Sequence, residues 1–279
     1  MKFYLETNAI RKLSKNLNSV ARPECFTSIL ALVELLSGID SERQYNVRKT
    51  IISNVYESKI YVDFDSSVEK FLNSYGIPFK LDFELEYIKI VETLLESNSY
   101  QDFIKKADSN NKTVWDFIKK LDTELSLTLK RAFSGKFQEL KESDDVKSVR
   151  SISEEWWSNF SISDIEKYTS DLMNRHASSI SRTPELNPQN RSQDELINNY
   201  NGSIDTAILF EALYRDSKIL WGGEVGRNDN ADLAHLFYLN DLTTAIVTDD
   251  KPLTKLIRKL MPERVLSCNE FMAKTHSNS

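Results

Sequence analysis

The sequence contains few glycines and none of the common nucleotide-binding loops. Only 7 of its 279 residues are glycine, whereas an average protein has about 7%. Few glycines mean few tight turns, which favours a helix-rich chain over a β-sandwich or barrel. The absence of a Gly-x-Gly-x-x-Gly or Walker sequence excludes the usual cradles for nucleotide phosphates.

The sequence also lacks long apolar runs and has almost no cysteine. Its longest apolar stretch, Ile29–Leu36, is interrupted by Glu34, whereas a membrane-spanning helix needs about 20 apolar residues. Cys25 and Cys268 are far apart without metal-ligand spacing, which suits a reducing compartment. The chain opens on a strand-like run and not on a secretory signal. We therefore expect a cytoplasmic protein with no membrane span.

The overall charge is mildly acidic. The sequence has 36 Lys and Arg against 42 Asp and Glu, a net charge of −6. This balance argues against a histone-like or wholly basic nucleic-acid coat. It is compatible with a nuclease, which needs only a local basic surface around an acidic, metal-binding centre.

Strand-like and helical patterns alternate near both ends of the sequence. Lys2–Leu5 is apolar without alternation, as in a strand covered on both faces. Asn8 is expected to cap a helix, and Ser28 is expected to cap a second one that ends at Gly38. Further strands are expected at residues 59–64, 245–247 and 264–267. The alternation predicts an α/β fold with a Rossmann-like parallel sheet flanked by helices.

The middle of the sequence has a different character. Strand-like runs nearly disappear there, and helical apolar periods occupy residues 84–96, 114–133 and 162–180. A capping box at Ser192-x-x-Glu195 marks another helix start. We therefore predict a discontinuous core of residues 1–80 and 200–279, interrupted by a large α-helical insertion at 81–199.

Four acidic positions adjoin apolar secondary structure, and the last of them is an adjacent pair. Glu6 follows the first expected strand, and Glu34 lies inside an otherwise apolar helix. Asp232 opens a helix, and the pair Asp249–Asp250 follows the 245–247 strand after Thr248. Ligands of parallel α/β sheets bind beyond the carboxyl ends of the strands. We expect Glu6, Glu34, Asp232 and Asp250 to meet there.

Carboxylates that converge in an apolar setting need a cation. They repel one another and are costly to bury unless an opposite charge offsets them. Carboxylate oxygens without a His or Cys cluster favour a hard ion, Mg²⁺ or Mn²⁺, over zinc. Such ions activate water and stabilise charge on a phosphodiester. The residues therefore suggest a metal-dependent phosphodiester hydrolase.

Five segments, taken in order, resemble the PIN-domain nucleases, which include the toxin ribonucleases of toxin–antitoxin pairs. The segments are YLETNAIRKL, FTSILALVELLSG, NDNADLAHLFYL, AIVTDDKPL and RVLSCNEF. The resemblance implies a metal-dependent endoribonuclease that cleaves RNA. It also suggests a homodimer and an inhibitory partner protein.

The resemblance assigns roles to individual residues of this chain. It implies that the four acids bind Mg²⁺ or Mn²⁺ and the attacking water: Glu6, Glu34, Asp232 and Asp250. It implies that polar neighbours orient these ligands or the phosphate: Thr7, Asn8 and Thr248, with Asp249 as the solvated neighbour of Asp250. Two features depart from the family pattern. Glu6 stands where Asp is usual, which alters its reach toward a metal, and the helical insertion roughly doubles the chain length.

Other interpretations of the same residues stay open. Glu6 and Asp232 could be helix N-terminal charges, and Glu34 could pair with Arg11 or Lys12. The candidate RNA contacts are three basic pairs, although such pairs are more often a solvated helix face: Lys105–Lys106, Lys119–Lys120 and Lys130–Arg131. Two other functions compete with the ribonuclease. One is a catalytically degenerate PIN-like module that binds RNA or protein, and the other is a metal phosphohydrolase acting on small phosphoesters.

Overall fold

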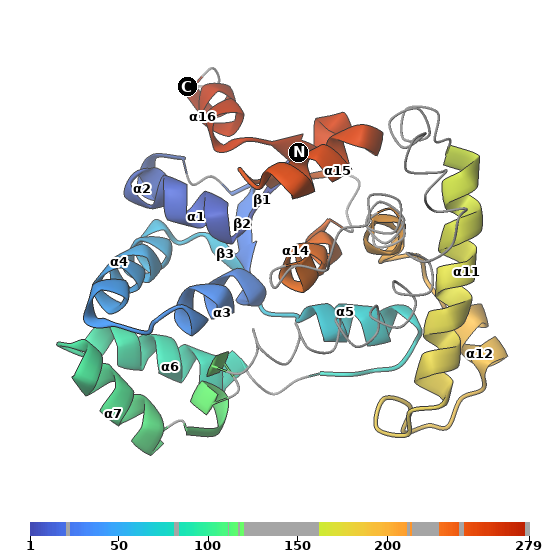
Figure 1. Cartoon of the computed structure of the whole chain (residues 1–279), viewed down its shortest axis with the longest axis horizontal. Helices are drawn as coiled ribbons and strands as arrows, with labels where there is room; N and C mark the ends of the chain where they lie inside the picture. The colour runs from blue at the N-terminus through green and yellow to red at the C-terminus, as the bar shows by residue number, and fades with distance from the viewer. Residues whose placement is uncertain are drawn as a thin grey trace, which may run out of the picture. The chain divides into compact units, whose positions relative to one another are not determined.

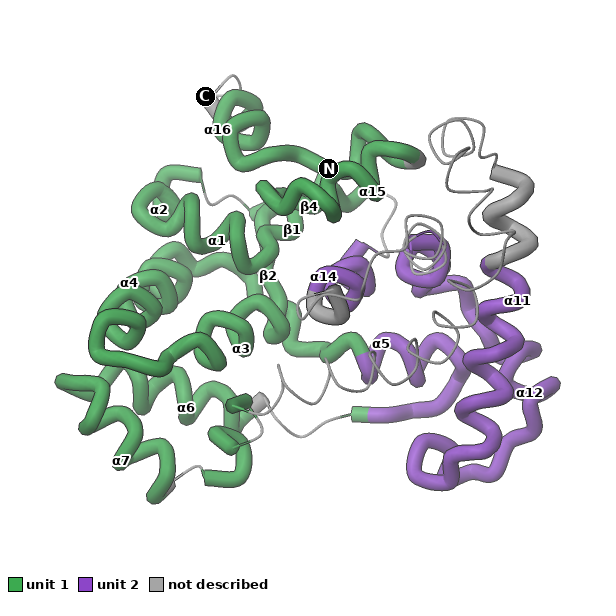
Figure 2. The backbone as a smooth tube through the Cα atoms, viewed as in Figure 1, with its two compact units in different colours: residues 1–67, 80–123, 241–279 green, residues 68–79, 124–240 purple. Residues whose placement is uncertain are grey.

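The computed structural model describes most of the chain (Figure 1). The described residues are 1–20, 23–80, 84–110, 112–116, 118–119, 162–210, 213, 229–239 and 243–276. Two compact units divide the chain (Figure 2). Unit 1 comprises residues 1–67, 80–123 and 241–279, and unit 2 comprises residues 68–79 and 124–240.

In the described part of unit 1, five strands form one sheet whose pairs are all parallel, in the order β3-β2-β1-β4-β5. The strands are β1 (Lys2–Leu5), β2 (Cys25–Ser28), β3 (Tyr61–Asp63), β4 (Thr244–Val247) and β5 (Val265–Leu266). Leu5 lies opposite Val247, and Ser28 lies opposite Asp63. The predicted parallel α/β sheet is confirmed.

Helices follow each strand of unit 1. They are α1 (Thr7–Leu13), α2 (Leu17–Val20), α3 (Ile29–Ser37), α4 (Glu42–Ser58), α6 (Glu84–Glu96), α7 (Tyr100–Asn110), α15 (Lys251–Leu260) and α16 (Cys268–His276), with short 3₁₀ turns η1 (Ser14–Asn16) and η3 (Pro262–Arg264). Helix α1 contacts α3, α4 and α16, and α4 contacts α6 and α7 (Figure 1). None of the described helices combines the length and apolar character that a membrane span requires.

The hydrophobic core of unit 1 extends from the sheet into the helices that follow it. Leu5 of β1, Leu35 of α3 and Ile52 of α4 belong to the same buried cluster as Phe103 of α7 and Trp115. The ring of Phe103 meets that of Trp115 edge-on, with centroids 5.0 Å apart. The described residues between 84 and 119 therefore contribute to the same core as the sheet.

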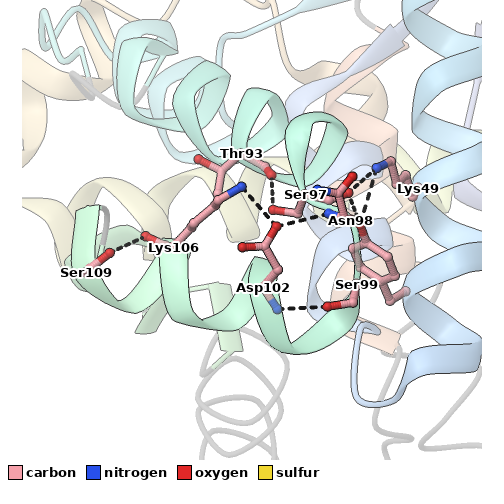
Figure 3. A network of polar contacts seen from close by, with 9 residues as sticks. Lys49, Thr93, Ser97, Asn98, Ser99, Asp102, Lys106 and Ser109 are labelled. Atoms are coloured by element: carbon pink, nitrogen blue, oxygen red, sulfur yellow. Dashed lines mark hydrogen bonds and ion pairs between the residues drawn. The ribbon is translucent and has the colours of Figure 1, made fainter.

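A polar network joins α4 to the turn between α6 and α7 (Figure 3). The carbonyl oxygen of Ser97 accepts a hydrogen bond from the Tyr45 hydroxyl at 2.5 Å and another from Lys49. The Asp102 carboxylate accepts from the amide of Asn98 at 3.0 Å and from Lys106 at 2.9 Å. The expected boundary of the helical insertion lay at residue 81, whereas the compact units place residues 80–123 with the sheet. The insertion itself stays a prediction, and its central part lies outside the described residues.

The described part of unit 2 consists of helices. They are α5 (Ser67–Ser74, whose first residue belongs to unit 1), α11 (Ile162–Ser181), α12 (Gln193–Asn198), a segment at 205–210 and α14 (Asp229–His235), which continues as the 3₁₀ turn η2 (Leu236–Tyr238). The turn after α5 is held by Arg191, whose guanidinium donates to the carbonyl oxygen of Gly76 at 2.6 Å. The predicted capping box of Ser192 and Glu195 is confirmed.

Most local predictions near the strands agree with the structure. The strand at Lys2–Leu5 and the helix between its Ser28 cap and Gly38 are confirmed. The predicted cap of α1 is wrong: the helix already begins at Thr7, so Glu6 is its N-cap, and the Glu6 carboxylate accepts from the amides of Asn8 and Ala9. Strand β2 was not predicted.

Candidate functional site

The carboxyl edge of the sheet brings together residues from distant parts of the chain. Leu5 and Val247 are the last residues of β1 and β4 and lie opposite each other. Glu6 and Thr248 therefore leave the sheet side by side, as neighbouring parallel strands require. The amide of Thr248 donates to the carbonyl oxygen of Leu266 at 2.9 Å, which ties the same edge to β5.

Glu6 is buried, with 3% of its surface exposed, and acts as the N-cap of α1. Its two carboxylate oxygens accept from the amide of Asn8 at 2.8 Å and from that of Ala9 at 3.2 Å. The positive end of the helix dipole also favours a carboxylate at this place. A carboxylate has about four acceptor positions, and two of those of Glu6 serve the cap of α1.

Thr7 connects Glu6 to Glu34. The Thr7 hydroxyl donates to Oε2 of the half-buried Glu34 on α3, and Thr7 follows Glu6 in the chain. The guanidinium of Arg48 donates to the backbone carbonyl of Glu34 at 3.3 Å, which anchors that turn of α3 to α4. Two of the four predicted acids therefore lie at the same corner of unit 1.

Asp249 forms an ion pair that crosses this edge. Its carboxylate lies 2.6 Å from Nζ of Lys12 on α1 and accepts from the amide of Cys268 at 3.1 Å. Burial raises the pKa of Asp249. The hydrogen bonds from Lys12 and Cys268, together with the positive charge of Lys12, outweigh burial and hold this pKa below its ordinary value. The sequence offers Lys12 as a partner for Glu34, whereas in the structure Lys12 forms its ion pair with Asp249.

Asp250 caps the helix that follows β4. Its carboxylate accepts from the amide of Leu253 at 2.7 Å, and its own amide donates to the Thr248 hydroxyl at 2.9 Å. Thr248 is fully buried, so it fixes the first turn of the loop between β4 and α15. The two adjacent aspartates therefore have different tasks: Asp249 is ion-paired, and Asp250 is a cap.

The cap at Asp250 gives a direct test of this local structure. Replacing Asp250 with Ala should lower the free energy of unfolding by about 1 kcal/mol, because the amide of Leu253 loses its acceptor. Replacing Asp250 with Asn should change it by only a few tenths of that value, since Asn is an equally good cap. Urea denaturation followed by circular dichroism measures both. Equal losses in the two variants would show that the side chain acts through its charge and not as a cap.

Cys268 contacts Asp249 through its amide, and it is buried. Burial raises the pKa of its thiol to about 12, and the charges of Asp249 and Glu6 act in the same direction. A pKa in this range favours the protonated thiol at neutral pH. The influence of both acids on one thiol also shows that Glu6 and Asp249 share a neighbourhood.

Asp232 belongs to the other compact unit. It is half-buried on α14, and His235 is buried in the last turn of the same helix. Glu6, Glu34 and Asp250 are in unit 1, whereas Asp232 is in unit 2. The meeting of all four acids therefore stays a prediction. Asn8, which was expected to orient the ligands, is exposed in the first turn of α1.

The donor types at this edge suit a hard divalent ion, although their present contacts are with the protein. Carboxylate and hydroxyl oxygens are what Mg²⁺ and Mn²⁺ prefer. In the part of the chain that the structure describes, no group of three or more His, Cys, Asp or Glu is gathered closely enough to hold a metal. The residues of the edge fit the ion by chemistry, and binding would have to compete with the caps of α1 and α15.

One acid at this edge was not singled out from the sequence. Asp63 ends β3 and lies opposite Ser28 of β2, so it is two strands away from Glu6 along the same edge. Its Oδ1 accepts from the amide of Asp65 at 3.0 Å. The signal was an acidic residue at the end of an expected strand, the same signal that selected Glu6.

The candidate RNA contacts are partly neutralised. Lys106 pairs with Asp102, as Figure 3 shows, and Lys119 pairs with Asp116 at 2.9 Å and Asp108 at 3.6 Å. Lys105 is exposed. The remaining candidates lie outside the described residues: Lys120, Lys130 and Arg131.

Comparison with known proteins gives no relative. No protein-family model, no curated protein and no solved structure matches the chain.

Proposed function

We propose that this chain is a PIN-like, Mg²⁺- or Mn²⁺-dependent endoribonuclease whose centre lies at the carboxyl edge of the sheet. The observation that supports the proposal is the parallel register of β1 and β4, which sets Glu6 beside Thr248. Thr7 holds Glu34 at this corner, and Asp250 follows Thr248 by two residues. Active sites of open parallel sheets are found at such edges.

Four acids would hold the ion in this proposal: Glu6, Glu34, Asp232 and Asp250. A bound divalent ion lowers the pKa of a water ligand and offsets the charge of the scissile phosphate. The chain's own part is to orient the oxygens. The amides of α1 fix Glu6, and the hydroxyl of Thr7 fixes Glu34. Cytoplasmic location, a homodimer, an inhibitory partner protein and a toxin–antitoxin context belong to the same proposal.

The test compares RNA with DNA and metal with chelator. The full chain is incubated with labelled single-stranded RNA and DNA of the same sequence, with Mg²⁺, Mn²⁺ or EDTA. We expect RNA fragments with either ion, none in EDTA, and recovery when metal is restored. Nitrophenyl phosphate should not be hydrolysed, which separates the ribonuclease from a small-phosphoester phosphohydrolase.

A matched control guards this assay against contamination. Glu24 is an exposed acid of unit 1 outside the proposed centre, so Glu24→Gln should cleave at the wild-type rate and Asp232→Asn should not cleave. Cleavage that survives EDTA, or that is the same in Asp232→Asn, would contradict the proposal.

One observation favours a second candidate, a metal-free module that binds RNA or protein. Glu6 and Asp250 cap helices, and Asp249 is ion-paired, so these acids have structural roles without a metal. A Mn²⁺ titration followed by thermal unfolding separates the candidates, since an ion that binds the native state raises the melting temperature. No thermal shift, together with RNA binding in EDTA, would favour the module.

A further inference from the structure

Two helices of unit 1 begin beside each other at the carboxyl edge of the sheet. Leu5 and Val247 end β1 and β4 opposite each other, and α1 and α15 follow these strands, capped by Glu6 and Asp250 (Figure 1). The sheet runs from β1 to β2 in one direction and from β4 to β5 in the other. Because such connections are right-handed in nearly all proteins, α1 and α15 lie on opposite faces of the sheet. Ligands of open parallel sheets bind in the crevice at this kind of reversal.

Both helices carry basic residues and no acidic ones. The chain has 42 Asp and Glu among its 279 residues, yet residues 7–23 and 251–262 contain none. Each of these two segments contains four Lys and Arg. The acids at the edge are therefore bordered on both faces of the sheet by positive charge, although the chain as a whole has a net charge of −6. A surface of one sign beside a crevice concentrates ligands of the opposite sign.

One side of α1, together with the turn η1 that continues it, is polar and basic. Its exposed residues recur at the i, i+3, i+4 and i+7 spacing that places side chains on one side of a helix: Asn8, Arg11, Lys12 and Lys15. Nζ of Lys12 lies 2.6 Å from the Asp249 carboxylate, so this side of α1 is turned toward the loop between β4 and α15. Among the described residues, Arg11 and Lys15 have no ion-pair partner.

Lys251 lies on the other side of the edge. It is the exposed first residue of α15, directly after the cap Asp250. A positive charge in the first turn opposes the helix dipole, so this lysine does not stabilise α15. It has no ion-pair partner within the described ranges, whereas Arg258 further along α15 is paired with Glu270 at 2.7 Å. Lys251 is therefore a positive charge that the local structure does not require.

We propose that Arg11, Lys15 and Lys251 bind the phosphate backbone of a single-stranded RNA that crosses the edge of the sheet from α1 to α15. The Arg guanidinium forms paired hydrogen bonds to a phosphate, and the Lys ammonium groups supply point charges. Basic tracks of this kind hold single strands without reading their sequence. The path brings a phosphodiester past Glu6 and Thr248. This inference rests on the proposed function, since it takes the strand to be the substrate.

The test measures binding without cleavage. The full chain is titrated in EDTA into a fluorescein-labelled oligouridine, and fluorescence anisotropy gives the affinity at several salt concentrations between about 50 and 200 mM. Each phosphate contact to a single strand contributes about 0.7 to the slope of log K against log salt, equivalent to about 5-fold in affinity at 0.1 M salt. Arg11→Gln combined with Lys15→Gln should therefore reduce the slope by about 1.4 and weaken binding about 25-fold. Lys251→Gln should reduce the slope by about 0.7.

Matched variants separate the charge from the structure. Arg11→Lys combined with Lys15→Arg keeps both charges and should bind RNA like the wild type. Lys59 is exposed just before β3 begins, at the end of that strand away from the carboxyl edge. Lys59→Gln should therefore leave the slope and the affinity unchanged. Urea denaturation should show equal stability in all of these variants, because the replaced side chains are exposed.

The path is supported if the Gln variants lose slope and affinity while the charge-keeping variant does not. Unchanged binding in the Gln variants, or an equal loss in Lys59→Gln, would overturn it. Polyglutamate represents an acidic protein partner, and competition by polyglutamate as strong as that by unlabelled RNA would overturn the assignment to RNA.

Failure of this inference can be told apart from failure of the proposed function. RNA binding that requires the three basic residues, in a protein that cleaves no RNA with Mg²⁺ or Mn²⁺, would support the path and contradict the ribonuclease. Metal-dependent cleavage with unchanged binding in the Gln variants would support the ribonuclease and contradict the path.

Discussion

Replacing Glu34 with Gln is expected to lower the rate of RNA cleavage by at least about 100-fold, beyond the loss typical of a residue that only supports a metal ligand. Gln has the shape of Glu, and its amide oxygen can still accept from the Thr7 hydroxyl, so the corner between α1 and α3 keeps its geometry. The negative charge that a divalent ion requires is lost. Single-turnover cleavage with excess protein measures the effect.

Thr7 supplies the matching control for this result. Thr7→Ser keeps the hydroxyl that orients Glu34, whereas Thr7→Val keeps the shape and removes the hydroxyl. We expect Thr7→Val to lose about 10- to 100-fold in rate and Thr7→Ser to lose little. A Glu34→Gln protein that is folded and cleaves RNA at the wild-type rate would remove Glu34 from the proposed centre.

Truncating Phe271 should have a large effect on stability. Its side chain is fully buried on α16, and its ring meets that of Phe3 edge-on, with centroids 5.2 Å apart. Phe271→Ala should lower the free energy of unfolding by about 3–5 kcal/mol, because apolar contacts are lost and a cavity is left. Urea denaturation followed by circular dichroism gives this value.

This second prediction tests whether α16 contributes to the stability of the sheet unit. The exposed Val47 on α4 is the control, and Val47→Ala should change stability by less than about 0.5 kcal/mol. If Phe271→Ala costs no more than Val47→Ala, α16 contributes nothing to the stability of the sheet unit.

Local signals in the sequence were sufficient for several elements. The start of α3 is fixed by a short-range contact. The hydroxyl of Ser28 accepts a hydrogen bond from the amide of Ala31 at 3.3 Å, three residues away. Ser192 and Glu195 form their capping box over the same short distance. Contacts of this kind depend only on neighbours in the chain, so residue type and spacing are enough to predict them.

Strand β2 was missed because its sequence merges with the next element. CFTS runs directly into the apolar helix ILALVELLS without a glycine or proline between them. Short apolar runs cannot be assigned to strand or helix by periodicity alone. Pairing with β1 and β3 on either side decides the matter, and these partners are distant in sequence.

Part of the candidate site could be predicted from the sequence, and part of it could not. The neighbourhood of Glu6 and Thr248 follows from strand ends in a parallel sheet, which the sequence predicts. The ion pair of Lys12 with Asp249 joins residues from opposite parts of the chain, and no local pattern reveals it. Asp232 lies on α14 in the second compact unit, and no local pattern in the sequence assigns α14 to that unit.

The central strand has a consequence for synthesis on the ribosome. β1 can pair with β2 soon after both emerge, but its other edge is complete only when Val247 arrives opposite Leu5. At translation rates of about 5–20 residues per second, this edge of β1 stays unpaired for on the order of 10–50 s. An open strand edge can pair with other chains. Arrested nascent chains that end before β4 should therefore recruit chaperones, and chains that include β5 should release them.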